Sequence, residues 1–294
     1  MNIIHKVLLS ILLFSFTIGP VSGTTAAVEP TPEEIAENPS LFKGEWTANK
    51  IAEITEEKYA GHSQISGVTM VMINAREQQR IRKMRIYRKD YGEELRDERT
   101  YTKFLEPADV RGTGYLGYEY DDNTREEESW LYMPALKKVK RLSASDKSDS
   151  FMGSDFSFND LKSNHREYWD YTFISESEMV DGKECWIIQG NPRPGMLGRI
   201  RDETGYKKTQ LWIRKDNFTK VKGKFWLLKG NRVKYMSAED IEKIDNVWTP
   251  LTLKMVTTKK GRVEHSTVMK FTKVEYNKVI EDGFLTSHGI ASGY

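Results

Sequence analysis

The feature that most constrains the fold is a succession of strand-like segments, separated by short turns, that runs from Val68 to Tyr276. The turns Asp181-Gly182, Lys229-Gly230-Asn231 and Lys259-Lys260-Gly261 are typical of β-hairpins, which make neighbouring strands antiparallel. Strands do not alternate with helices, so the pattern disfavours a parallel sheet. Because the succession is unbroken, we predict a mainly β chain with a single antiparallel sheet.

We expect about 11 to 13 strands in this sheet. The candidate strands are Val68–Ala75, Arg80–Tyr91, Glu94–Leu105, Thr113–Tyr120, Glu128–Met133, Val139–Leu142, Tyr171–Met179, Lys183–Gly190, Lys207–Arg214, Lys220–Leu228, Arg232–Ile241, Val247–Thr257 and Val263–Tyr276. A long segment with neither strand nor helix periodicity, residues 143–168, interrupts them.

Alternation along the strands predicts one apolar face and one wet face, as in antiparallel sheets. Few helical residues are available to cover the apolar face, and this shortage predicts a cavity that a ligand could fill. An ordinary core in which methionine fills irregular gaps is the alternative. Strand parity gives these candidate lining residues: Met70, Met72, Met84, Met133, Val221, Phe225, Leu227, Leu251, Leu253 and Met255.

The long segment between the strands is expected to be an ordered flap over the apolar face. A loop of this length is uncommon in a compact domain and is usually functional or disordered. Its apolar residues argue against disorder, and we expect Phe151, Met152, Gly153, Phe156 and Phe158 to form the lid. Because an empty cavity destabilises a fold, the unliganded protein should have either a mobile lid or a flap that has fallen inward.

A short basic ribbon precedes the flap. It contains Lys137, Lys138, Lys140 and Arg141. The simplest interpretation is the wet edge of the sheet. The functional alternative is a contact with anionic lipid headgroups or with an acidic partner.

The segment from Trp130 to Leu161, which reads WLYMPALKKVKRL and then SDKSDSFMGSDF, resembles the outer-membrane lipoprotein-sorting (LolA-like) family. The specific branch is the one often found beside transporters of the resistance-nodulation-division type. FLEPADVRGTG, from Phe104 to Gly114, resembles the preceding signature of the same family. The resemblance implies a curved, half-open sheet like an incomplete barrel, with a few short helices and the flap on its concave face. It further implies a hydrophobic cavity for lipid or an acylated protein, an inner-membrane transporter as partner and transient contact with a membrane surface.

The N-terminus has the pattern of an exported protein. Residues 1–23 are typical of a cleaved signal peptide, and no cysteine lies near the cleavage site for lipid attachment. Residues 24–47 form a polar leader in which Thr31-Pro32-Glu33-Glu34 predicts the start of a short helix. Ile35, Leu41, Phe42 and Trp46 could pack this leader against the sheet. We expect residues 48–294 to be a single carrier domain.

Other classes of function receive little support. The 45 basic and 43 acidic residues nearly balance, which gives no electrostatic case for nucleic acid. Cys185 is the only cysteine, and its strand-like surroundings predict a buried, inert thiol. The five histidines are scattered without metal-ligand spacing, so we expect no metal or other cofactor.

The sequence thus favours a periplasmic carrier, not an enzyme, that binds a lipid or lipoprotein acyl chains. Two alternatives stay open. One is an envelope binding or assembly factor on the same scaffold that does not transport. The other is a hydrolase that uses the Ser- and Asp-rich flap, for example Asp155 and His165, although no nucleophile motif is present.

Overall fold

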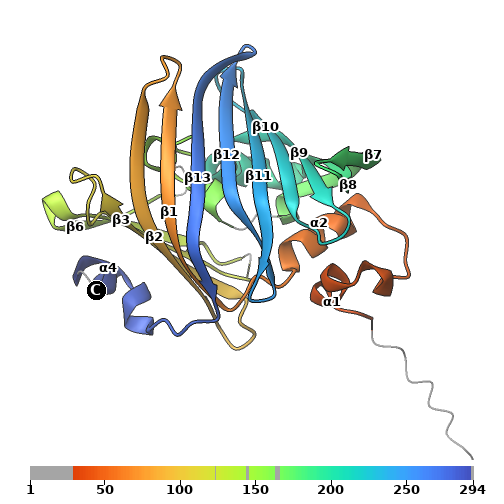
Figure 1. Ribbon diagram of the computed structural model, residues 1–294, viewed down its shortest axis with the longest axis horizontal. Coiled ribbons are helices and arrows are strands. Elements are labelled where there is room, and N and C mark those ends of the chain that lie inside the picture. Colours follow the sequence, from red (N-terminus) through yellow and green to blue (C-terminus); the bar gives the residue numbers. More distant parts are fainter. Residues whose placement is uncertain (1–28, 123, 144–145, 163–165, 293–294) are drawn as a thin grey trace, which may run out of the picture.

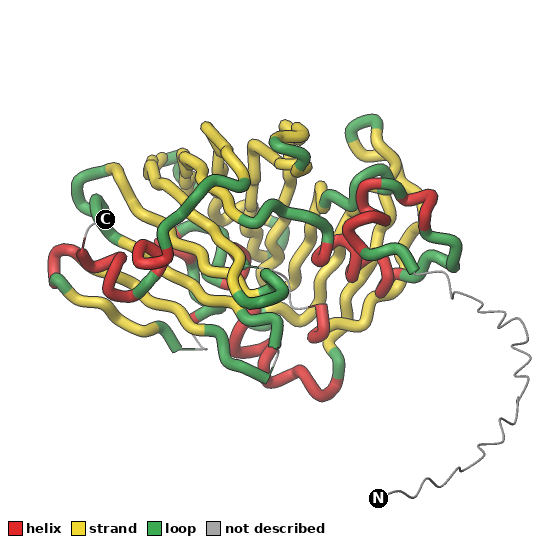
Figure 2. Tube along the Cα trace, turned by 90° about the horizontal axis from the view of Figure 1, so that it is seen from below, coloured by secondary structure: helices red, strands yellow, loops and turns green. Residues whose placement is uncertain are grey.

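The computed structural model describes residues 29–122, 124–143, 146–162 and 166–292. Within them the chain forms one antiparallel sheet of thirteen strands. The sheet is strongly curved, as Figures 1 and 2 show. The strands are β1 (Ser63–Asn74), β2 (Gln79–Tyr91), β3 (Asp97–Glu106), β4 (Gly114–Glu119), β5 (Glu128–Met133), β6 (Lys138–Arg141), β7 (Trp169–Val180), β8 (Lys183–Pro192), β9 (Tyr206–Arg214), β10 (Lys220–Leu227), β11 (Arg232–Ile244), β12 (Val247–Lys259) and β13 (Arg262–Tyr276). Each corresponds to a predicted strand. The signal peptide predicted at 1–23 lies outside the described residues, as does His165.

The order of the strands divides the sheet into two meanders. It runs β6-β5-β4-β3-β2-β1-β13-β12-β11-β10-β9-β8-β7, so that the strands within each half are sequence neighbours. Among the described strands, the pairing of β1 with β13 joins the two halves. The sheet does not close, because β6 and β7 are its free edges. The flap connects these two edges and therefore has to cross a face of the sheet.

Helices are few and short. They are α1 (Pro32–Glu37), α2 (Ala48–Glu57), α3 (Leu197–Arg199) and α4 (Ser287–Ser292), with single turns at Pro39–Leu41, Pro134–Leu136, Phe151–Gly153, Asn159–Leu161, Arg166–Tyr168, Pro194–Met196, Ile200–Thr204 and Asp282–Leu285. In α1 the side chain of Thr31 accepts a hydrogen bond from the backbone N–H of Glu34, and the Glu34 side chain accepts one from the N–H of Thr31. This reciprocal cap confirms the helix start predicted there.

The sequence analysis did not identify α2, which is capped by Thr47. Its buried residues Ile51 and Ile54 join Ile35 of α1 in the main core, so both helices pack on the same face of the sheet. Of the leader residues proposed to make this contact, Phe42 and Trp46 pack against the core, whereas Leu41 is exposed and that prediction is wrong.

The main core lies on the face covered by the flap and these helices, here called the inner face. Its sheet residues include Met70, Met84, Phe104 and Met255, from both meanders. On the outer face the C-terminal segment packs Ile280, Leu285 and Ile290 against Tyr101 and Leu116. The remainder of the outer face has no helix over it in the front view of β1, β2, β12 and β13 (Figure 1).

One predicted alternation is broken by an irregularity in β10. Lys220 pairs with Ile213 and Lys222 pairs with Trp212, which are adjacent residues of β9 and so lie on opposite faces. Val221 consequently packs in a small separate cluster with Val180 and Cys185, not with Phe225 in the main core. The prediction that Val221 shares a face with Phe225 and Leu227 is therefore wrong.

Candidate binding site

The flap lies on the inner face with its aromatic side chains buried. Phe151, Phe156 and Phe158 are 1%, 3% and 8% exposed. The ring centroid of Phe151 lies 5.9 Å from that of Phe104 on β3 and 5.8 Å from that of Tyr115 on β4. Such distances are those of favourable aromatic contacts. The flap thus has the inward-fallen arrangement, one of the two expected of the unliganded protein.

The structure brings most of the predicted lining residues together beneath this flap. Met70, Met72, Met84, Phe225 and Met255 are buried in the main core, and Leu227 and Leu253 pack against it. The exceptions are Val221, in its separate cluster, Leu251, which packs beside Val247 and Tyr276, and Met133, which is half-buried at the end of β5. The interior is filled: Met70 and Phe104 are both 0% exposed.

The remaining predicted site residues lie at the surface. Met152 packs partly on the core, whereas Gly153 is exposed, and a Cβ there would meet nothing within 4 Å. The ribbon of Lys137, Lys138, Lys140 and Arg141 is exposed along the edge strand β6. Basic side chains along an edge also discourage pairing with other chains.

A buried carboxylate attaches the flap to the two central strands β12 and β13. Asp155 accepts hydrogen bonds from the hydroxyls of Thr257 at 2.5 Å and Thr267 at 2.7 Å. Its other contact is with Nδ1 of His265 at 2.6 Å, and its own N–H donates to the Thr267 hydroxyl. Asp155 is buried, and hydrogen bonds to a carboxylate are of the stronger kind.

A second flap carboxylate, that of Asp160, is bound in the same way by side chains of β9 and β11. Asp160 receives hydrogen bonds from the Tyr206 hydroxyl at 2.6 Å and from the Lys234 ammonium at 3.0 Å. Burial opposes the ionisation of Asp160, but Lys234 and the Ser157 N–H outweigh it and lower the pKa of this carboxyl. The flap is therefore attached to the sheet at two points by buried polar groups. We call Asp155 and Asp160 the latch residues.

The latch geometry does not resemble a hydrolytic triad. In such a triad the histidine lies between the hydroxyl and the carboxylate. Here Thr257 and Thr267 donate directly to Asp155, which leaves no hydroxyl activated by His265. Other polar residues of the flap bond locally, as when the carboxylate of Asp146 accepts from the N–H of Ser143. These contacts are those of turns.

An open cleft lies at the end of the sheet where β2 ends and β3 begins. Its volume is about 1360 Å³, and it is lined mainly by charged side chains, thirteen acidic and nine basic. None of the predicted methionines lines it, and Arg141 is the one predicted site residue that does. The cleft is thus separate from the apolar interior.

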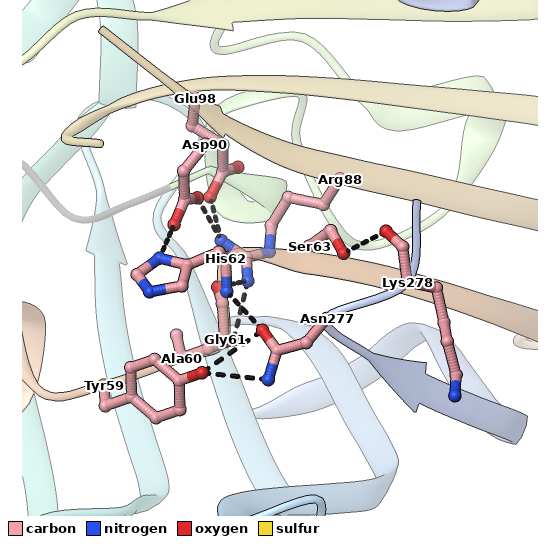
Figure 3. Close-up of polar contacts among 10 residues, drawn as sticks. All are labelled: Tyr59, Ala60, Gly61, His62, Ser63, Arg88, Asp90, Glu98, Asn277 and Lys278. Carbon is pink, nitrogen blue, oxygen red and sulfur yellow. Dashed lines mark hydrogen bonds and ion pairs between the residues drawn. The ribbon is translucent and has the colours of Figure 1, made fainter. Parts of the chain in front are cut away.

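Arg88 is the organising residue of this cleft (Figure 3). Its guanidinium donates to Asp90 and Glu98, both at 2.9 Å, and to the carbonyl oxygens of Ala60 and Gly61 at the start of β1. Burial disfavours its charge, but the two carboxylates prevail and raise the pKa of Arg88. Asp90 also contacts His62 at 3.4 Å. The cluster ties the residues after α2 to β2 and β3.

Two further buried charges border the cleft near α2. Burial, followed by repulsion from Lys220 and Arg214, lowers the pKa of Lys58 to about 7. Its ammonium donates to the carbonyl of Phe218 at 2.9 Å. Burial raises the pKa of Glu56 to about 8 against the attraction of Lys220.

Opposite them, buried Lys162 of the flap pairs with Glu127 at 2.8 Å, and Lys147 pairs with the same carboxylate at 3.1 Å. An acidic run such as residues 121–128 is typical of a solvated hairpin tip. Glu127 departs from this pattern, because its side chain is only 8% exposed. The two lysines of the flap account for its burial, because a buried carboxylate needs partners of this kind.

Sequence reasoning missed these polar residues for identifiable reasons. The partners of Arg88 lie on β2, on β3 and in the loop before β1, and no local pattern in the sequence joins them. Asp155 and Asp160 lie in the flap, whereas their partners Thr257, Thr267 and Lys234 are far away in sequence. Burial does confirm the prediction for Cys185, where it raises the pKa of the thiol to about 11.

Neither a metal cluster nor a membrane-spanning helix was found in the described ranges. No group of three or more His, Cys, Asp or Glu side chains there could hold a metal ion. None of the helices within the same ranges has the length and apolar character needed to cross a bilayer.

One curved, unclosed antiparallel sheet, with short helices and a flap on its inner face, is the architecture of the LolA-like fold. The structure superposes on a LolA superfamily protein from Nitrosomonas europaea with a TM-score of 0.61 and 18% identity, over 83% of this chain and 99% of that one. At this identity the likeness concerns the fold. It confirms the architecture expected from the sequence.

A family model described as an uncharacterized protein matches residues 96–291, and the chain belongs to that family. Two solved structures are similar over 83% of this chain. One is a DUF1329 family protein from Desulfovibrio piger, with 27% identity, a TM-score of 0.73 and 97% of that chain covered. The other is a putative outer membrane lipoprotein-sorting protein domain from Vibrio parahaemolyticus, with 25% identity, a TM-score of 0.72 and 98% covered. A comparison with curated proteins gave no match.

Proposed function

We propose that this protein is a periplasmic carrier, without enzymatic activity, that binds the acyl chains of a lipid or lipoprotein between the sheet and the flap. The observation that carries the proposal is the packing of Phe151, Phe156 and Phe158 over a floor rich in methionine. Methionine adapts to irregular apolar ligands because its side chain is unbranched and flexible. The lipoprotein-sorting name of the Vibrio relative supports the same class of cargo.

The interior can be filled either by the three phenylalanine rings of the flap or by an acyl chain, and the free energies of burying the two are comparable. Burying a phenylalanine side chain contributes about 1.5–3 kcal/mol, so the three rings contribute roughly 5–9 kcal/mol to the closed flap. A sixteen-carbon acyl chain contributes up to about 11 kcal/mol at about 0.8 kcal/mol per methylene, before the loss of freedom on binding. Cargo can therefore replace the rings without a large net change in free energy.

The partners of such a carrier follow from the resemblance and from its surface. We propose export by the signal peptide and delivery of cargo from an inner-membrane transporter of the resistance-nodulation-division type. The exposed ribbon of Lys137, Lys138, Lys140 and Arg141 would contact the headgroup of the cargo or this partner. Arg141 lines the charged cleft, which supports a contact on that side of the molecule.

The test is the lipid content of protein purified from the periplasm without detergent. Organic extraction and mass spectrometry should find acyl lipids in stoichiometric amounts. Hydrogen exchange should show faster exchange of flap amides in the lipid-loaded protein than in the delipidated protein, with β12 and β13 unchanged. Absence of lipid, together with a flap that exchanges as slowly as the strands, would contradict the carrier.

That negative result would favour a second candidate, a binding or assembly factor that does not transport. The observation in its favour is that the large cleft around Arg88 is lined mainly by charged side chains and by none of the methionines of the apolar interior. Such a factor would use the cleft and keep the interior permanently filled.

A further inference from the structure

The end of the sheet at which β1 ends and β2 begins carries the tips of three neighbouring hairpins. Each tip is a turn with the strand residues beside it: residues 75–80 of the β1–β2 hairpin, 259–264 of the β12–β13 hairpin and 228–232 of the β10–β11 hairpin. The first two project at the top of Figure 1. Asn74 pairs with His265, and Arg232 pairs with Lys259, so the three tips stand side by side along one end of the sheet. We call these three segments the basic rim.

The rim is strongly and unevenly charged. It carries seven basic side chains, Arg76, Arg80, Lys229, Arg232, Lys259, Lys260 and Arg262, and only two acidic ones, Glu77 and Glu264. Arg232 and Glu264 pair with each other at 2.5 Å, and this is the one ion pair of the rim among the residues that the structure describes. The other five net positive charges face solvent, although the whole chain has a formal charge of only +2.

Two apolar side chains stand among these charges. Val263 is 59% exposed and Leu228 is 44% exposed. They belong to adjacent tips, because the N–H of Lys260 donates to the carbonyl of Asn231 at 3.3 Å. Exposed aliphatic side chains beside lysine and arginine are the composition of surfaces that rest in a bilayer interface.

We propose that the basic rim docks on the surface of an anionic phospholipid bilayer. Lysine and arginine at the tips would lie among the lipid phosphates, and Leu228 and Val263 would enter the acyl boundary. A bilayer is favoured over an acidic protein because the rim exposes isolated aliphatic side chains among its basic ones. A protein partner would instead need a continuous complementary surface.

The experiment is flotation of the full mature protein with phosphatidylcholine vesicles, with and without phosphatidylglycerol. The rim variant is K259E/K260E/R262E. The control is K243E/K273E/K278E, which reverses three exposed lysines toward the opposite end of β11 and β13. Thermal melts of both variants establish that they fold.

Each basic side chain near an anionic surface strengthens binding about fivefold. We therefore expect the rim variant to bind phosphatidylglycerol vesicles at least about 100-fold more weakly than wild type, and the control to bind within a few fold of it. Binding of the wild type should be lost in about 1 M salt, where screening is nearly complete.

Two results would overturn the proposal. One is equal weakening by the rim variant and the control, because total charge and not the rim would then decide binding. The other is failure of the wild type to bind anionic vesicles at low salt, which would leave an acidic protein as the partner of the rim. Neither result depends on cargo in the interior. A rim variant that still co-purifies with lipid but no longer binds vesicles separates this proposal from the carrier function.

Discussion

Removing the ring of Phe151 should open the flap and strengthen the binding of an acyl ligand. Phe151 is 1% exposed and contacts the rings of Phe104, Tyr115 and Phe158. Truncating a buried phenylalanine to alanine destabilises the packed state by about 3–5 kcal/mol. If the flap opens independently of the sheet, this loss shifts its opening equilibrium by a factor of about 100 or more.

The apparent affinity for an acyl chain rises by the same factor as the open population, until the open state predominates. The assay is the titration of delipidated Phe151→Ala protein with a fluorescent fatty acid, with the wild type in parallel. We expect binding to be tighter by one to two orders of magnitude, although the closed state is less stable in urea.

Phe218→Ala is the matched control. Phe218 is also buried, but it packs against Trp46 and Trp186 beneath the leader. This variant should lose comparable stability without gaining affinity. If both variants lose stability and neither binds the ligand more tightly, the flap is a fixed part of the core and the reasoning is refuted.

Three further predictions concern buried charges. Asp155→Asn should weaken the latch and raise hydrogen exchange of the flap amides about tenfold or more, whereas exposed Asp149→Asn should not. Lys58→Met should stabilise the protein by about 3 kcal/mol more at pH 6 than at pH 9, measured by urea unfolding. Burial lowers the pKa of Lys58 in the folded protein to about 7 from the ordinary 10.5, so the wild type loses stability as the pH falls toward 7. If Lys58→Met stabilised the protein equally at both pH values, the titration of Lys58 would be excluded as the cause. Arg88→Met should cost about 3–5 kcal/mol of stability at pH 7, because it leaves two carboxylates without their cation, and less at lower pH, because burial raises the pKa of Asp90; exposed Arg85→Met serves as its control, and urea unfolding measures both.

The strands were predictable because their signals are local. Alternation and turn residues mark each hairpin, and every expected strand is present within a few residues. The burial of Phe151, Phe156 and Phe158 was predictable as well, since a long loop with so many apolar side chains has to pack. The helix at 48–57 was missed because α2 is short and its capping residue, Thr47, closes the leader.

The polar parts of the site were not predictable from one sequence. The partners of Asp155 follow it by more than 100 residues, so only the fold brings them together. The face predicted for Val221 from strand alternation was also wrong, because the irregularity in β10 between Lys220 and Lys222 shifts the register there. Local periodicity therefore predicts the strands of this chain, whereas the long-range pairing of strands decides which charged side chains come into contact.

The pairing of β1 with β13, here called the seam, joins the two meanders and affects how the chain folds. Within each meander every strand pairs with its neighbour in sequence, and such short loops close at little entropic cost and quickly. The seam joins residues near 70 to residues near 270 and requires the longest loop closure in the sheet. We expect two meanders that form early and a slow final step that unites them, so that substitutions in β13 retard folding more than equally buried ones in β4.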